Sequence, residues 1–166
     1  MSDDREGCYL AAMRILRYRF NSEVELRRKL RSKRFESDDI DVTIARLRDE
    51  KWLDDERFAG AFVRTRSNKS VGKRRILREL QAAGVDSDSA KAAVAENLDP
   101  EREMEQLKAL CVKRMRALAR RHGEEWLGTD EGRNKLTVWL LNQGYDAALV
   151  QSVIREKNLG HHQSDS

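Results

Sequence analysis

The sequence predicts an all-α protein made of three tandem three-helix, helix-turn-helix-like repeats that form an elongated, curved array. Three observations support this prediction. The 166 residues contain one proline, Pro100, and nine scattered glycines, so few positions interrupt helices. Apolar residues recur four apart, which is helical spacing. The same set of apolar positions occurs three times along the chain.

The repeat consists of four apolar positions with a break between the inner two. These positions hold, in successive copies, Leu26, Leu30, Ile40 and Ile44; Ile76, Leu80, Ala90 and Val94; and Leu136, Leu140, Val150 and Ile154. The break is Arg34-Phe35, Gly84-Val85 and Gly144-Tyr145. A glycine followed by an apolar residue is typical of a helix that stops before the next begins. Each copy therefore predicts a helix, a tight turn and a second helix.

Residues that commonly cap helices stand at the expected starts. Ser22 with Glu25 has the spacing of a capping box, and Asp86 and Asp146 precede the last helix of the second and third copies. A further helix leads each pair. The first leading helix passes through Leu10, Met13, Ile15 and Leu16, the second starts at Asp54 between Leu53 and Phe58, and the third runs from Asp99-Pro100 to about Arg121.

The expected units are residues 1–50, 51–98 and 99–158, followed by a disordered tail at 159–166. The third unit has the longest leading helix, with Met104, Leu107, Cys111, Met115 and Leu118 on one face. A unit of about fifty residues buries little apolar surface alone, so stacking against its neighbour is expected to add stability.

Composition narrows the class of protein. Charged residues make up 37% and hydrophobic residues 39% of the chain, and no apolar run approaches the roughly 20 residues that a membrane span needs. The polar start of the chain lacks the features of a secretory signal, so a soluble, cytoplasmic protein is expected. Cys8 and Cys111 stand in no metal or redox spacing and are interpreted as buried small side chains.

The net charge is +4, but basic and acidic residues alternate in blocks along the repeat. Residues 64–81 contain seven basic side chains and one acidic one, whereas residues 84–105 contain two and seven. Helical spacing places a basic stripe opposite the apolar stripe. The candidate partner-binding residues on this basic face are Arg28, Arg31, Arg64, Arg66, Lys73, Arg74, Arg75, Arg78, Lys113, Arg116 and Arg120.

Two interpretations of this basic face remain open. Charged stripes are often only solvated surfaces that keep a protein soluble. A stripe that recurs on successive units also suits a long anionic or repetitive partner, such as nucleic acid or a protein polymer. The third unit departs from the pattern, because Val138 and Leu141 replace polar residues beside Trp139. That helix is either buried more deeply, which is the favoured interpretation, or a docking surface.

Sequence-specific DNA reading and catalysis lack candidate residues. The helices after the turns, residues 86–97 and 37–50, are acidic or alanine-rich, whereas base readers present basic or amide side chains. No phosphate-binding glycine motif is present. The acids Asp54, Asp55 and Glu56 suit a helix start, and His122 and the pair His161-His162 lack companion metal ligands. No catalytic residue, cofactor or metal is expected.

Three segments resemble the RecX family, the regulators of bacterial RecA recombinase. They are residues 22–30 (SEVELRRKL), residues 52–59 (WLDDERFA) and residues 72–80 (GKRRILREL), the last leading to Ala83-Gly84-Val85. The resemblance is good over residues 9–98. Over residues 100–157 it is looser and depends mainly on Leu140 and Gly144-Tyr145.

The resemblance implies three tandem three-helix repeats and a non-enzymatic inhibitor of RecA. Such a protein is expected to bind the RecA filament on DNA and to modulate ATP hydrolysis, strand exchange and co-protease activity in recombination, DNA repair and the SOS response. The expected partners are the RecA filament and, weakly and non-specifically, single- or double-stranded DNA, with no membrane partner and a monomeric state. The alternative is a non-specific nucleic-acid-binding helical repeat protein, which would bind bare DNA with a steep salt dependence.

Overall fold

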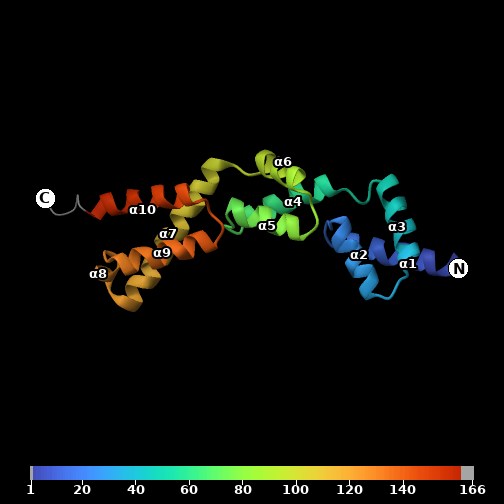
Figure 1. The fold of residues 1–166 in the computed structure, drawn as a ribbon, viewed down its shortest axis with the longest axis horizontal. Coiled ribbons are helices and arrows are strands. Elements are labelled where there is room, and N and C mark those ends of the chain that lie inside the picture. The colour runs from blue at the N-terminus through green and yellow to red at the C-terminus, as the bar shows by residue number, and fades with distance from the viewer. Residues whose placement is uncertain (1, 162–166) are drawn as a thin grey trace. The chain divides into compact units, whose positions relative to one another are not determined.

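The computed structural model describes residues 2–161, which form ten helices and no strand (Figure 1). The helices are α1 (Ser2–Leu16), α2 (Glu23–Ser32), α3 (Ser37–Asp49), α4 (Asp55–Ser67), α5 (Lys73–Ala82), α6 (Ser87–Asn97), α7 (Pro100–His122), α8 (Glu124–Leu127), α9 (Asp130–Asn142) and α10 (Ala147–His161). The all-α prediction is confirmed. Nine helices correspond to the three predicted triplets, and α8 is a short helix that the sequence did not indicate.

The helix starts follow the capping residues. The Ser22 hydroxyl accepts a hydrogen bond from the Glu25 amide at 3.1 Å, and the Asp99 carboxylate accepts one from the Glu101 amide at 3.0 Å. Asp86 similarly accepts from the Ser89 amide at 3.0 Å. These bonds satisfy amide groups that a helix start otherwise leaves without partners. The Glu25 carboxylate pairs with Arg19, so only the Ser22 half of the predicted capping box forms.

All twelve apolar positions of the repeat are buried. Helices α1, α2 and α3 pack around a core that includes Leu26, Leu30, Ile40 and Ile44. Helices α7, α9 and α10 pack around a second core, and α8 packs against α7 and α9. Cys8 and Cys111 are fully buried in these two cores with free thiols, as expected.

The chain divides into two compact units, each of which is described by itself. One contains the residues up to 64 together with 77–97, and the other contains 65–76 together with the residues from 98 onward. The division cuts through α4 and α5, whereas the predicted boundaries lie between helices. Hydrogen bonds explain this for α5, because the segment before it bonds to the turn after α9, and the turn after it bonds to Ser22.

The end of α10 differs from the expected boundary at 158. Its backbone is helical to His161, three residues further than predicted. The remainder of the expected tail, residues 162–166 with His162, lies outside the described residues.

Candidate partner-binding surface

Basic side chains in the first unit are extensively paired with carboxylates. Arg27 lies 2.8 Å from Glu23 and also bonds to Asp41, and these hydrogen bonds raise the pKa of its guanidinium, the bond to Asp41 most. Arg46 pairs with Glu50 at 2.8 Å, and hydrogen bonds from Tyr9 and Arg46 lower the pKa of that carboxyl. Exposed pairs of this kind stabilise a fold by about 1 kcal/mol at most. Their charges are neutralised within the chain and offer little attraction to a partner.

A second group of cations is exposed and takes part in no ion pair or side-chain hydrogen bond within residues 2–161. It contains eight of the residues predicted for the basic face: Arg28, Arg31, Lys73, Arg74, Arg78, Lys113, Arg116 and Arg120. We call these eight residues the unpaired basic set. Because no internal carboxylate has to be displaced, their charge is available to an anionic partner.

Helical geometry explains why this set points outward. On α2, Leu26 and Leu30 are fully buried, and Arg28 and Arg31 stand on the other side of the helix. On α5, Arg74 and Arg78 lie opposite the fully buried Ile76 and Leu80.

The backbone at the start of α5 is held in place by a buried acid. The Lys73 amide donates a hydrogen bond to the Glu103 carboxylate at 2.9 Å, and Glu103 is itself buried. This bond positions the helix and leaves the Lys73 side chain exposed.

Helix α7 repeats the arrangement over a longer span. Leu107, Cys111 and Leu118 are buried along one face, and Lys113, Arg116 and Arg120 are exposed on the other. The last turn of α7 is basic, as suits the negative end of the helix dipole. A structural role in stabilising this helix end therefore accounts for part of the charge near Arg120.

Three predicted residues of the basic face interact with other groups of the protein and so fall outside the unpaired basic set. Arg64 is exposed but hydrogen-bonds the side chain of Asn97. Arg66 and Arg75 are only half-exposed, and each makes a further interaction within the protein. Arg75 also packs against the turn after α9, where a Cβ on Gly144 would overlap it. Helical spacing alone missed the contacts of Arg64 with Asn97 and of Arg75 with Gly144, because these partners are far away in the sequence.

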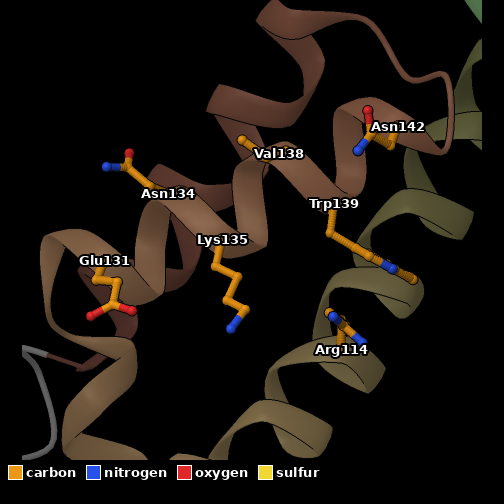
Figure 2. A pocket seen from close by; sticks show the side chains of 7 residues that line it. All are labelled: Arg114, Glu131, Asn134, Lys135, Val138, Trp139 and Asn142. Atoms are coloured by element: carbon orange, nitrogen blue, oxygen red, sulfur yellow. The ribbon is translucent and has the colours of Figure 1, made fainter.

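Helix α9 of the third repeat lines a groove and has no basic stripe like those of α2 and α5. The favoured expectation that this helix is deeply buried is wrong for Val138, which is 56% exposed, and Trp139 and Leu141 are half-buried. The groove measures about 710 Å³ and is lined by Arg114, Glu131, Asn134, Lys135, Val138, Trp139 and Asn142. Figure 2 shows Trp139 reaching from α9 toward Arg114 on α7.

Positive charge flanks the apolar part of this groove. The Arg114 guanidinium lies 4.8 Å from the centre of the Trp139 ring, a cation–π contact. Its Nε is buried without a hydrogen-bond partner in the described chain. Lys135 extends from α9 beside them (Figure 2). The groove thus combines an apolar wall with two cations and one carboxylate, Glu131. The excess of positive charge suits an acidic segment carrying an apolar side chain.

The described residues do not meet the requirements of a metal site, a membrane span or a reactive thiol. No group of three or more histidine, cysteine, aspartate or glutamate side chains there could hold a metal ion. No helix within residues 2–161 has the length and apolar character of a membrane span. Burial raises the pKa of both the Cys8 and the Cys111 thiol, which disfavours reactive thiolates. The His122 ring stacks on Trp126 at 4.3 Å between centres.

Comparison with known proteins relates this chain to a family. A model of the first three-helix domain of RecX matches residues 8–47, and a model of the second three-helix domain matches residues 54–94. Regulatory protein RecX of Serratia proteamaculans is 33% identical over 87% of this chain and 94% of its own length. The chain belongs to the RecX family.

Further RecX proteins extend the match. RecX of Xanthomonas oryzae pv. oryzae is 32% identical over 87% of this chain and 84% of its own length. RecX of Oceanobacillus iheyensis is 28% identical over 93% of this chain, which spans only 54% of that longer relative. These relatives are named regulatory proteins, which defines the family at a coarse level.

Solved RecX structures share the fold. The crystal structure of RecX from Lactobacillus salivarius superposes with a TM-score of 0.78 at 27% identity, covering 96% of this chain and 99% of that one. A second RecX crystal structure, at 21% identity, gives a TM-score of 0.76 and supports the fold alone. The family models cover the first two repeats, so the third repeat is related to RecX mainly through these structures and the longer alignments.

Proposed function

We propose that this RecX-family protein is a cytoplasmic, monomeric and non-enzymatic inhibitor of RecA that binds the RecA filament on DNA. In this role it modulates the ATPase, strand exchange and co-protease activities of RecA in recombination, DNA repair and the SOS response. The unpaired basic set is the observation that carries the proposal. Its residues lie on α2, α5 and α7, so all three repeats present positive charge that the protein itself does not neutralise.

A filament suits such a distributed surface for a physical reason. Each exposed cation adds little affinity alone, but contacts made at the same time to neighbouring protomers of a polymer act together. Complementary charge also speeds the encounter between partners. The groove beside Trp139 supplies a contact of a different kind, which depends on apolar burial and two cations. In this proposal it receives an acidic and apolar segment of the filament.

The same basic residues favour a second candidate function, non-specific binding to nucleic acid. Lys and Arg side chains that contact phosphates release counterions, so affinity for bare DNA would fall steeply with salt. The two candidates differ in what they require. A filament regulator needs the recombinase, whereas a DNA-binding protein does not.

A pull-down with purified RecA separates them. The protein is immobilised and mixed with RecA, with single-stranded DNA, or with both, in the presence of a non-hydrolysable ATP analogue. We expect strong retention only when RecA, DNA and nucleotide are present together, with retention kept at physiological salt. Equal retention of bare DNA, lost as salt rises, would support the second candidate and contradict the proposed function.

A further inference from the structure

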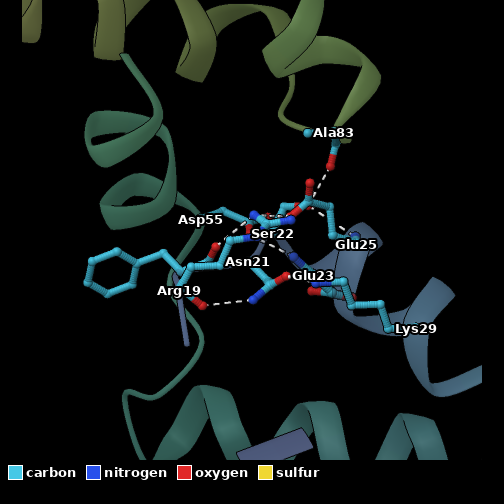
Figure 3. A network of polar contacts seen from close by, with 9 residues as sticks. Arg19, Asn21, Ser22, Glu23, Glu25, Lys29, Asp55 and Ala83 are labelled. Atoms are coloured by element: carbon cyan, nitrogen blue, oxygen red, sulfur yellow. Dashed lines mark hydrogen bonds and ion pairs between the residues drawn. The ribbon is translucent and has the colours of Figure 1, made fainter. Parts of the chain in front are cut away.

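The start of α2 docks onto the turn between α5 and α6. The Ser22 hydroxyl, which accepts from the Glu25 amide, donates its own proton to the Ala83 carbonyl at 2.5 Å (Figure 3). Val24 covers the next residue, Gly84, so closely that a Cβ on Gly84 would overlap the valine side chain. Ser22 is fully buried by this contact.

The start of α5 docks in the same way onto the turn between α9 and α10. The Gly72 amide donates to the Gln143 carbonyl at 3.0 Å, and the Arg74 amide donates to the Gly144 carbonyl at 2.9 Å. A Cβ on Gly72 would overlap the backbone of Gly144 and Tyr145, and a Cβ on Gly144 would overlap Arg75.

These two contacts use equivalent positions of the repeat. Position 22 corresponds to 72 and then 132, and position 34 corresponds to 84 and then 144. Each of these contacts is a joint between two repeats and has two sides. We call the helix start with its buried small residue the donor, and the glycine turn that it packs against the acceptor. The acceptor turn has positive φ, 89° at Gly84 and 93° at Gly144. The two joints use the donors at 22 and 72 and the acceptors at 84 and 144. Within residues 2–161, the donor at 132 and the acceptor at 34 have no partner of this kind.

The remaining donor position is covered by α8. Gly132, at the start of α9, is buried, and a Cβ there would overlap the Trp126 carbonyl and crowd the Leu127 backbone. At the equivalent residue Gly72, the backbone of Gly144 and Tyr145 lies where the Trp126 carbonyl lies at Gly132. The extra helix of the third repeat thus occupies the third donor position with backbone, as a fourth repeat would.

The remaining acceptor position carries a side chain. Arg34 adopts φ 68°, the left-handed conformation of the equivalent glycines, and is exposed. Its Cβ stands where the other two turns receive a docking helix start. Left-handed φ costs a residue with a Cβ about 1 kcal/mol, so a glycine here would be locally favourable. Arginine stands at a position where backbone geometry favours glycine; Lys51 and Ser70 also have positive φ, but neither occupies the turn position of the repeat.

We propose that α8 and Arg34 close the two ends of a head-to-tail interaction surface whose partner is a second copy of this chain. A donor at α9 and an acceptor at the Arg34 turn are different surfaces, so their pairing between copies is heterologous and links copies into a ring or an open chain. Repeat proteins need atypical ends for solubility. The two features act as such ends, and this inference does not depend on binding to RecA or on its inhibition.

The test opens each end separately and then both together. Arg34→Gly opens the acceptor. The donor is opened in two ways: by replacing part of α8 (Glu125→Gly, Trp126→Ser, Leu127→Gly), or by inserting a short Gly-Ser linker after Gly128, which keeps α8 but releases it from Gly132. Sedimentation velocity at rising concentration reports the mass of each variant, and circular dichroism reports its helix content.

We expect wild type and every singly opened variant to stay at the 19.2 kDa monomer mass. Each doubly opened variant is expected to reach at least about twice that mass at micromolar concentrations. Adding Gly132→Val to a doubly opened variant places a side chain on the donor and should restore the monomer.

Three outcomes would overturn the inference. The first is a doubly opened variant that stays monomeric with wild-type helix content. The second is association of Arg34→Gly alone. The third is loss of helix in both α8 variants, because α8 would then be an essential part of the third core and not a cap.

Discussion

Helices α5 and α9 occupy the same place in successive repeats but present different outer faces. Their inner positions, Ile76 and Leu80 on α5 and Leu136 and Leu140 on α9, are all buried. At the equivalent outer positions, α5 has Arg74 and Arg78, whereas α9 has Asn134 and Val138. One helix presents unpaired charge and the other lines a groove.

This difference shows that packing restricts the residue types at the inner positions of the repeat and not those at the outer positions. Interiors are packed closely, so the inner positions accept only apolar side chains of suitable size. Outer positions touch water and tolerate almost any residue at a cost of about 0.5 kcal/mol or less. The outer faces are therefore where one repeated fold can carry two kinds of partner contact.

The largest expected effect is the loss of inner packing on either helix. Leu80→Ala and Leu140→Ala each remove a fully buried side chain and should lower the free energy of unfolding by about 2 to 5 kcal/mol. Chemical denaturation followed by circular dichroism measures both. A cost below about 1 kcal/mol for one of the two would show that the helices are not packed alike.

Charge reversal on α5 should affect the proposed partner and spare the fold. Arg74→Glu with Arg78→Glu changes the local charge by four units, and inhibition of RecA ATP hydrolysis should weaken by about tenfold or more at low salt. Arg75 is left unchanged because it packs against Gly144. The matched control, Arg14→Glu with Lys51→Glu, makes the same charge change at exposed positions outside the unpaired basic set. If both pairs of substitutions weaken the inhibition equally, Arg74 and Arg78 make no specific partner contact and belong to an ordinary solvated surface.

A change in the groove should weaken inhibition with a different salt response. Val138→Asp puts a carboxylate on the exposed apolar wall, and we expect a loss of inhibition of about threefold to tenfold that persists at high salt. Val42→Asp on α3 is the control, since Val42 is 47% exposed and lies outside the groove. If Val138→Asp inhibits as well as its control, the groove makes no partner contact.

The turns after α5 and α9 differ at Val85 and Tyr145, and the tyrosine should produce a pH effect. Burial and the nearby Glu103 carboxylate raise the pKa of Tyr145 to about 12, and its hydroxyl donates to the Ser70 carbonyl at 3.1 Å. The folded protein therefore holds this proton more tightly than the unfolded chain. The stability it contributes is complete below pH 10, the ordinary value, and is lost as pH rises through about 12.

Tyr145→Phe tests this effect. We expect a loss of about 1 kcal/mol at neutral pH from the missing hydrogen bond and a weaker decline of stability at high pH. Thermal unfolding at several pH values measures both. In wild type, an ultraviolet absorbance titration should show a tyrosine that ionises near pH 12, and this step should be missing from Tyr145→Phe. An unchanged titration curve for Tyr145→Phe would contradict the raised pKa of Tyr145.

The sequence by itself determined the helices, their capped starts, the buried repeat positions and the resemblance to RecX. These features depend on residues a few positions apart, and the periodicity of one helix or the spacing of one cap is complete within its own segment. The exposed face of α5 at Arg74 and Arg78 was predictable for the same reason.

Only the tertiary structure decided which cations are free and which positions are covered. Arg64 meets Asn97, Arg75 meets Gly144, and α8 covers Gly132, each through contacts outside the local helical pattern. The exposure of Val138 and the groove beside Trp139 likewise depend on where α7 lies against α9. Contacts of this kind follow from how distant segments pack, and the period of a single helix contains no information about them.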